Sequence, residues 1–97
     1  MRKLAAVLLL LTLSGVAAAA TITIDNPNLT TATVTFQWLE GGRIYGPYQI
    51  APNATETFEV EAGTYDIIVD NGNGDSYVLY EEQIGEQDAG FFHQVKD

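Results

Sequence analysis

The side chains best suited to bind a metal ion are gathered around one short segment, Asn71–Asp75. Asp70, Asn73 and Asp75 bring side-chain oxygens close together in the sequence, and the intervening glycines let the backbone bend. Calcium takes several hard oxygen ligands on a flexible backbone, so these three residues are the predicted ligands of a Ca²⁺ site. Ser76, however, stands where a calcium-binding loop needs its glycine. An ordinary Asn-Gly hairpin turn explains the same residues, and both interpretations stay open at the level of sequence.

Aromatic residues provide a second candidate for ligand binding, because the chain has more rings than a small core can hold. These rings are Tyr45, Tyr48, Tyr77, Tyr80, Phe91 and Phe92. Strict alternation places Tyr45 outward, beside the Gly46-Pro47 bend. Exposed rings offer a large contact area at low entropic cost, so Tyr45 and Tyr48 are predicted to stack on a sugar or anchor a peptide. The alternative is that such rings only cover the open ends of the fold.

Two other aromatic residues are predicted to be structural. Trp38 ends a series of alternating apolar residues that begins at Ala32, a position typical of a buried tryptophan in a β-sandwich. Tyr65 follows Gly63 by two residues, which suits a tyrosine whose hydroxyl bonds to nearby backbone at a corner of the fold. We therefore expect both side chains to stabilise the core rather than bind a ligand.

Few side chains are available for catalysis. Beyond residue 20 the chain has one histidine, His93, one serine, Ser76, and no cysteine. A nucleophile that needs both a base and an orienting group therefore has almost no candidates. Glu59 and Asp66 would form a carboxylate pair if their strands were adjacent, but a glycosidase also needs a cleft between its acids. We predict no catalytic residues and expect a protein that is not an enzyme.

The first twenty residues have the order of a secretory signal peptide. Two basic residues precede an apolar run, and a series of small residues closes the segment. This pattern predicts a helical leader over residues 1–20, cleaved near Ala19 or Ala20, and a single domain over residues 21–97. The apolar run is too short to span a bilayer, which needs about 20 apolar residues. The protein is thus expected to be secreted or periplasmic, and free of the membrane after cleavage.

Loss of the leader would leave a strongly acidic domain without cysteine. Arg43 and Lys96 would then be the two remaining cations against thirteen acidic residues, which gives a net charge of −11. Such a charge is repelled by nucleic acid and by anionic membrane surfaces, so neither is an expected partner. Cationic partners and divalent ions are compatible with it. Because the chain has no thiol, packing alone must stabilise so small an exported domain.

Apolar and polar residues alternate with a period of two between successive turns. Seven short strands are predicted, with no helix beyond residue 20. Their ranges are 21–25, 32–38, 43–50, 55–60, 64–70, 76–84 and 91–95. Close turn spacing favours a single small antiparallel two-sheet β-sandwich, because a parallel sheet would need helical crossovers. We expect Thr21–Asp25 and a strand beside the Gly46-Pro47 bend to be sheet edges.

The stretch from Pro52 to Val69 resembles part of an immunoglobulin-like or prealbumin-like domain. A Pro52-Asn53 turn, an apolar strand around Phe58 and a Gly63-Thr64-Tyr65 entry to the next strand are similar to carboxypeptidase-regulatory-like modules. In this chain Asn53 replaces the glycine that usually follows the proline. The resemblance implies a β-sandwich and no particular activity, since such modules serve adhesion, scaffolding and ligand binding alike.

Together these observations predict a secreted, non-enzymatic β-sandwich that acts as a binding or interaction module for a protein or cell-surface partner. Strand addition at an exposed sheet edge, or contact with an aromatic and acidic face, is the expected mode of binding. The alternative is a small-ligand binder that takes Ca²⁺ at Asn71–Asp75 or carbohydrate on its rings. No cofactor other than Ca²⁺ is expected.

Overall fold

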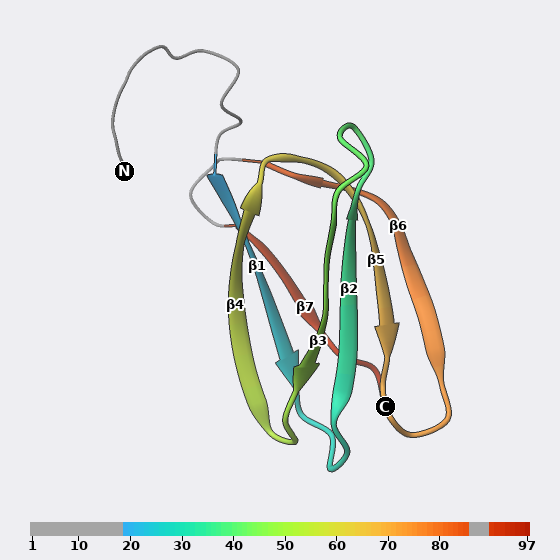
Figure 1. The fold of residues 1–97 in the computed structure, drawn as a ribbon. Coiled ribbons are helices and arrows are strands. Elements are labelled where there is room, and N and C mark those ends of the chain that lie inside the picture. The colour runs from blue at the N-terminus through green and yellow to red at the C-terminus, as the bar shows by residue number, and fades with distance from the viewer. Residues whose placement is uncertain (1–18, 86–89) are drawn as a thin grey trace.

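The computed structural model describes residues 19–85 and 90–97, which form seven β-strands in two sheets (Figure 1). In chain order the strands are β1 (Ala19–Asn26), β2 (Ala32–Trp38), β3 (Ile44–Ile50), β4 (Ala54–Glu61), β5 (Gly63–Asp70), β6 (Ser76–Ile84) and β7 (Phe91–Gln94). The prediction of a seven-stranded, all-β, two-sheet domain is therefore confirmed.

The predicted leader helix falls mainly on residues 1–18, which lie outside the described residues. The predicted boundary after residue 20 falls within β1, because this strand begins at Ala19. In the described part of the chain, no helix has the length and apolar character needed to cross a membrane.

The strands divide into a sheet of three, in the order β4-β1-β7, and a sheet of four, in the order β3-β2-β5-β6. The larger sheet is antiparallel throughout. In the smaller sheet β7 runs parallel to β1, with Phe91 opposite Ile22, so the prediction of a fully antiparallel sandwich is wrong for this pair. A parallel pair needs a long connection. The five intervening strands provide it in place of a helix, because β1 and β7 are the first and last strands.

β1 is the central strand of the smaller sheet, so the prediction that Thr21–Asp25 forms an edge is wrong. Alternation indicates which face of a strand is buried, but not how many neighbours the strand has. The second neighbour of β1 is β7, which lies at the other end of the chain and could not be paired with it from the pattern. The other predicted edge is confirmed, since β3 contains Gly46-Pro47 and lies at the border of the larger sheet.

The core lies between the sheets and is built from alternate residues of the strands. Its largest fully buried apolar side chains are Ile22, Ile24, Val34, Phe36, Ile50, Tyr65, Ile67, Val69 and Ile84. Each fully buried aliphatic or aromatic side chain contributes about 1.5–3 kcal/mol to folding. Burial of this kind is the main stabilisation available to a domain without disulfides.

An extra residue in β3 changes the direction in which Tyr45 points. Val34 lies opposite Tyr48 and Phe36 lies opposite Tyr45, so three steps along β3 match two along β2. Gly46 lies in this bulge with a φ of 103°, and a Cβ there would lie 3.0 Å from the Val34 carbonyl oxygen. Tyr45 and Tyr48 therefore both pack against the core, and the prediction that Tyr45 faces outward is wrong.

A second bulge, in β6, fixes an orientation that the sequence pattern left open. Tyr65 lies opposite Glu82 and Ile67 lies opposite Leu79, and between them Glu81 adopts a left-handed φ of 55°. Because Tyr65 and Ile67 face the core, Leu79 and Glu82 lie on the core side of β6 on either side of the bulge. The bulge returns Ile84 to the core-facing side, where it is buried, while Val78 and Tyr80 lie on the outer face.

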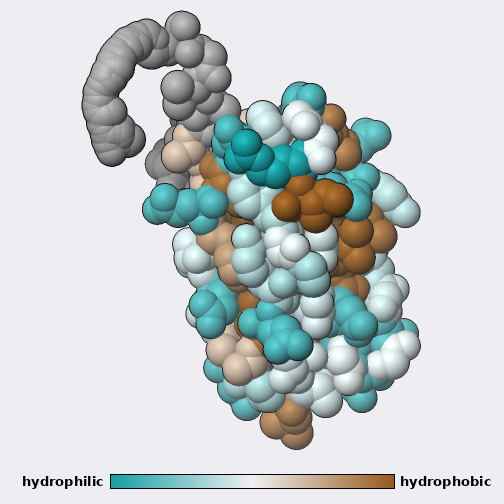
Figure 2. Space-filling view, viewed as in Figure 1, coloured by the Kyte–Doolittle hydropathy of each residue, from teal (hydrophilic) through white to brown (hydrophobic). Residues whose placement is uncertain are grey.

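In the part of the chain that the structure describes, few large apolar side chains are exposed. In Figure 2 the apolar colour appears in separate groups, and polar or intermediate residues cover most of the visible face. The large exposed apolar residues are Leu29, Leu39, Ile44, Tyr80 and Phe92. Single apolar residues at a surface are normal in monomeric proteins. Sheet edges and local clusters, rather than one broad apolar patch, are therefore the places to look for a binding site.

Candidate functional site

β3 and β4 belong to different sheets, follow each other in the chain and form one side of the sandwich, here called the β3/β4 side (Figure 1). Rings from both strands close this side. Tyr48 stacks on Phe58 with 4.5 Å between ring centroids and 23° between ring planes. Phe58 in turn meets Phe36 edge-on at 5.3 Å. Since Tyr48 and Phe58 are only partly buried, the core reaches the surface here.

Tyr45 takes part in a polar bridge between the sheets. Arg43 Nη1 lies 3.3 Å from Glu61 Oε1 and donates to the Tyr45 hydroxyl at 3.4 Å. The hydroxyl accepts from the backbone N–H of Glu61 and donates to its carboxylate, both at 3.4 Å. The hydrogen bond with Tyr45, and next the charge of Glu61, raise the pKa of Arg43. The predicted binding residues Tyr45 and Tyr48 thus lie on one side of the molecule, Tyr45 in the bridge and Tyr48 in the ring stack.

β4 is a long edge strand without interruption. All eight of its residues pair in continuous register with β1, from Ala54 opposite Asn26 to Glu61 opposite Ala19. Its other edge has no strand neighbour among residues 19–85 and 90–97. The exposed residues of β4 are Thr55, Glu56, Thr57 and Glu59. An unpaired edge of this kind offers a row of backbone N–H and C=O groups to another extended chain.

The other three sheet edges are shorter or interrupted. β3 and β6 each contain a bulge, and Pro47 in β3 has no backbone N–H to donate. β7 has four residues. Bulges and short edge strands are common means of preventing pairing with another chain. β4 is therefore the edge best formed to accept an added strand.

Glu56 is a charged residue on the core-facing side of β4. It lies opposite Ile24, whose side chain is fully buried, yet Glu56 itself is exposed at the rim. A charge in this position discourages an apolar strand from pairing with the edge. Sequence reasoning missed both Glu56 and Phe58 as surface features. Their alternation with Val60 could be seen in the sequence. Alternation does not show, however, that the strand lies at the edge of a sheet.

The predicted Ca²⁺ ligands Asp70, Asn73 and Asp75 lie at the turn between β5 and β6, where hydrogen bonds within the turn explain the geometry. Asp70 Oδ1 accepts from the N–H of Gly72 at 2.9 Å. Asn71 Oδ1 accepts from the N–H groups of Asn73 at 2.8 Å and Asp75 at 3.2 Å. In the described part of the chain, no group of three or more His, Asp or Glu side chains is placed to hold a metal ion. The Ca²⁺ site stays a prediction to which this geometry adds no support.

Two buried asparagines, Asn26 and Asn71, hold the loops at this end of the sandwich; neither exposes more than 1% of its surface. The Asn26 side-chain amide donates to three backbone carbonyl oxygens in neighbouring segments, at 2.9, 3.0 and 3.2 Å. The Asn71 side-chain amide donates to the carbonyl oxygen of Lys96 at 3.1 Å, and the Thr30 hydroxyl donates to the Asn71 carbonyl oxygen at 2.9 Å. Sequence reasoning placed both asparagines in turns and did not predict that either side chain is buried and holds neighbouring loops.

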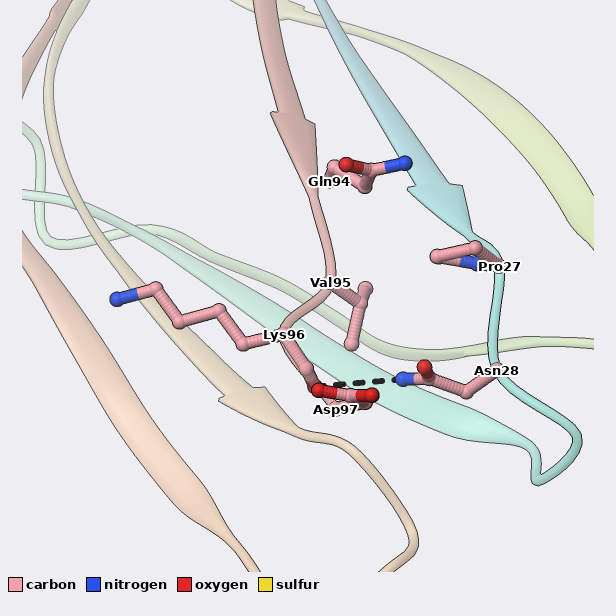
Figure 3. Close-up of a pocket in the computed structure, with 6 residues that line it drawn as sticks. All are labelled: Pro27, Asn28, Gln94, Val95, Lys96 and Asp97. Atoms are coloured by element: carbon pink, nitrogen blue, oxygen red, sulfur yellow. Dashed lines mark hydrogen bonds between the residues drawn. The ribbon is translucent and has the colours of Figure 1, made fainter.

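An open cleft of about 450 Å³ lies at the same end, between the loop after β1 and the chain after β7 (Figure 3). Its lining residues are Pro27, Asn28, Gln94, Val95, Lys96 and Asp97. The Asn28 side-chain amide donates to the Lys96 carbonyl oxygen at 3.3 Å, which joins the two walls. The Lys96 amino group points away from Asn28 and lies 5.0 Å from the ring centroid of Tyr77. These polar groups serve the fold and do not converge on a ligand.

His93 and Tyr77 form a contact between β7 and β6 through their side chains. The Tyr77 hydroxyl accepts from the backbone N–H of Lys96 at 3.0 Å, and His93 Nε2 lies 2.7 Å from the same hydroxyl. With one lone pair of the hydroxyl occupied, its proton is available to Nε2 of a neutral imidazole. Burial, and next the charge of Lys96, lower the pKa of His93. The pair joins the two sheets on the side opposite β3 and β4.

Trp38 and Tyr65, the two predicted structural aromatics, both pack against the core. The Trp38 ring lies between Gly41 and Gly63 so closely that a Cβ at either glycine would overlap with it. Its Nε1 is buried without a hydrogen-bond partner in the described part of the chain. Tyr65 is fully buried, and its hydroxyl donates to the carbonyl oxygen of Glu61. Burial raises the pKa of Tyr65, as expected for a phenol inside a core.

No family model, curated protein or solved structure matches this chain. A functional proposal therefore rests on the geometry of the strand edges and of the side chains around them.

Proposed function

We propose that the chain is a secreted, non-enzymatic binding module and that a protein partner adds a strand to the free edge of β4. The observation that carries this proposal is the continuous pairing of β4 with β1, of which six pairs, Thr21–Asn26 with Ala54–Glu59, lie beyond the predicted cleavage site. No strand of the described residues lies on the other edge of β4. In strand addition, backbone hydrogen bonds give affinity and contacts of alternate side chains give specificity.

The β3/β4 side supplies the side-chain contacts that such a partner needs. An added strand would place alternate side chains beside the partly buried rings of Phe58 and Tyr48, which already stack on each other. Aromatic residues are enriched at protein interfaces, because they bury a large area with little loss of side-chain entropy. Tyr45 and its bridge from Arg43 to Glu61 would limit the site at one end of β4.

Two further assignments belong to the same proposal. The order of residues 1–20 supports export to the periplasm or the medium. The resemblance of residues 52–69, together with two facing sheets, supports membership of the immunoglobulin-like or prealbumin-like class of sandwiches. Such folds host many functions, so the binding role rests on β4 and not on the class.

A photo-reactive residue tests the proposal in cells that produce and export the full chain. We expect benzoylphenylalanine in place of Thr57, at an exposed position of β4, to form cross-links with one partner protein. The cross-linked site should fall within one short segment of that partner. The matched control is Gln83→benzoylphenylalanine, on the exposed edge strand β6. Amide hydrogen exchange of the purified complex should then show new protection in β4. Equal cross-linking at both positions, or a complex in which β4 stays unprotected, would overturn strand addition.

A second candidate function is carbohydrate binding on the outer face of the smaller sheet. Phe92 is 62% exposed and lies opposite Thr23. Beside them Asp25 accepts from the Thr55 hydroxyl at 2.7 Å and from the Gln94 side-chain amide at 3.1 Å. A ring that can stack on the apolar face of a sugar, next to a flat row of hydroxyl, amide and carboxylate groups, suits a neutral polysaccharide.

Affinity electrophoresis in gels that contain soluble polysaccharides tests this second candidate. We expect Phe92→Ala to abolish retardation, because the stacking ring is lost. Tyr80→Ala is the matched control, since Tyr80 is 70% exposed on the other sheet. Retardation that is unchanged by Phe92→Ala, or absent for every polysaccharide, would remove carbohydrate binding from consideration.

A further inference from the structure

We infer that the strand added to β4 is basic, with lysine or arginine opposite Glu56 and Glu59 and an apolar residue opposite Phe58. This inference rests on the strand-addition proposal and names the chemistry of the partner. Its starting point is that both glutamates are exposed on the strand whose edge is free. An extended chain paired there would lie within reach of both carboxylates, because directly opposite residues have Cβ atoms about 4.5–5.5 Å apart.

No lysine or arginine side chain of the described residues forms an ion pair with either carboxylate. Arg43 is engaged by Glu61 at 3.3 Å. Lys96 lies against Tyr77, on the side of the sandwich opposite β4. Neither Glu56 nor Glu59 takes part in a salt bridge within residues 19–85 and 90–97. A partner cation would therefore meet carboxylates that no lysine or arginine side chain of these residues engages.

The faces of β4 specify where the basic residues of the partner must stand. Glu56 and Phe58 are on the core-facing side, because they pair with Ile24 and Ile22, while Thr57 and Glu59 are on the outer side. From its N-terminus to its C-terminus, the four partner residues opposite Glu56–Glu59 would be basic-apolar-x-basic if the partner runs antiparallel to β4. They would be basic-x-apolar-basic if the partner runs parallel to β4. The apolar side chain would extend the stack that Phe58 already makes with Tyr48.

Charge also decides between a basic partner and a second copy of the chain. A second β4 would bring its own two exposed glutamates to the same acidic edge, and like charges that come opposite each other across a strand pair are destabilising. The same carboxylates favour a basic strand and speed its approach. The edge thus combines an attractive element for one partner with a repulsive element against self-pairing.

Three eight-residue strand peptides test the inference with the full exported protein. They share a central valine and flanking threonines, and differ only in lysine, glutamine or glutamate at the two positions opposite the carboxylates. Amide shifts in NMR spectra report the site, and titrations at low and high salt report affinity. We expect the lysine peptide to shift β4 and to bind about 2- to 30-fold more tightly than the glutamine peptide, from two exposed ion pairs. High salt should reduce this preference.

Matched double variants assign the preference to the proposed residues. Glu56→Gln with Glu59→Gln should abolish the preference for lysine and retain binding of the glutamine peptide. Glu81→Gln with Asp75→Asn removes the same charge from exposed sites elsewhere and should retain the preference. Circular dichroism spectra identical to that of the unmodified protein establish that both variants fold.

The other possible results contradict either the basic partner, strand addition to β4, or a heterologous partner. Equal affinity for the lysine and glutamine peptides at β4 contradicts the basic partner and leaves strand addition standing. Absence of β4 shifts with every peptide contradicts strand addition itself. A dimer seen by sedimentation without peptide, and broken by Thr57→Pro on β4, would instead make a second copy the occupant.

Discussion

Asn71 is the residue on which the turn between β5 and β6 depends most. Its side-chain amide donates a hydrogen bond to the Lys96 carbonyl oxygen, and its side-chain oxygen accepts from two backbone N–H groups of the turn. Asn71→Ala leaves these groups without their partner, and an unsatisfied buried group costs about 1–3 kcal/mol. We expect the free energy of unfolding in urea to fall by about 2 kcal/mol. Asn73→Ala, at an exposed position of the same turn, should change it by less than about 0.5 kcal/mol; equal losses would contradict the assigned role.

His93 should make stability depend on pH. Burial and Lys96 lower its pKa in the folded protein below the ordinary value of 6.5, so the unfolded chain binds the proton more readily. The stability that comes from the neutral ring is therefore present above about pH 6.5 and is lost as pH falls through the lowered pKa. Melting temperatures from pH 8 to pH 5 should fall more steeply for the unmodified protein than for His93→Gln. Parallel curves would show that His93 is protonated equally in both states.

The bulge in β6 holds Glu81 in a left-handed conformation with φ 55°. Glycine adopts this conformation without steric cost, but it also loses more entropy on folding. We expect Glu81→Gly to raise the free energy of unfolding by about 0.5–1 kcal/mol in urea denaturation. Gln83→Gly, in the regular part of the same strand, should lower it by a similar amount. A loss at both positions would mean that the bulge is not strained at Glu81.

Most of the strands were predictable, because alternation survives wherever a strand is regular. It fails at the bulges, since one extra residue reverses every side chain beyond it; Tyr45 was misplaced for this reason. Pairing between strands that are far apart in the sequence could not be predicted either, as the parallel pair of β7 and β1 shows. Asn26 and Asn71 did leave a signal. Each continues the inward series of its strand, after Ile24 and Val69, where a polar residue must find hydrogen bonds.

The candidate site was only partly predictable at this scale. Tyr45 and Tyr48 could be chosen because the chain has more aromatic residues than a small core can hold. The stack of Tyr48 on Phe58, however, joins two different sheets across a turn, and no local pattern predicts it. The free edge of β4 depends on the whole strand order, which no local pattern contains. Sequence reasoning therefore named strand addition at a sheet edge as the expected mode of binding, but it named Thr21–Asp25 and the strand beside Gly46-Pro47 as the edges, and not β4.

The whole molecule is acidic, and its stability should respond to salt. Two cations among residues 21–97 face thirteen acidic side chains, so screening relieves repulsion within the folded state. We expect the melting temperature to rise between low salt and about 0.5 M NaCl, and to rise less in the Glu56→Gln, Glu59→Gln variant. A melting temperature that falls with salt would indicate that favourable ion pairs dominate.

Amide hydrogen exchange along β4 tests strand addition to this domain most directly. In the free protein, the N–H groups of β4 that point away from β1 should exchange rapidly, while those that bond to β1 are protected. A saturating amount of the lysine strand peptide should slow the rapid set by about tenfold or more and leave β3 and β6 unchanged. Uniform protection of β4 in the free protein, or new protection that falls on another edge, would contradict the central role of this strand.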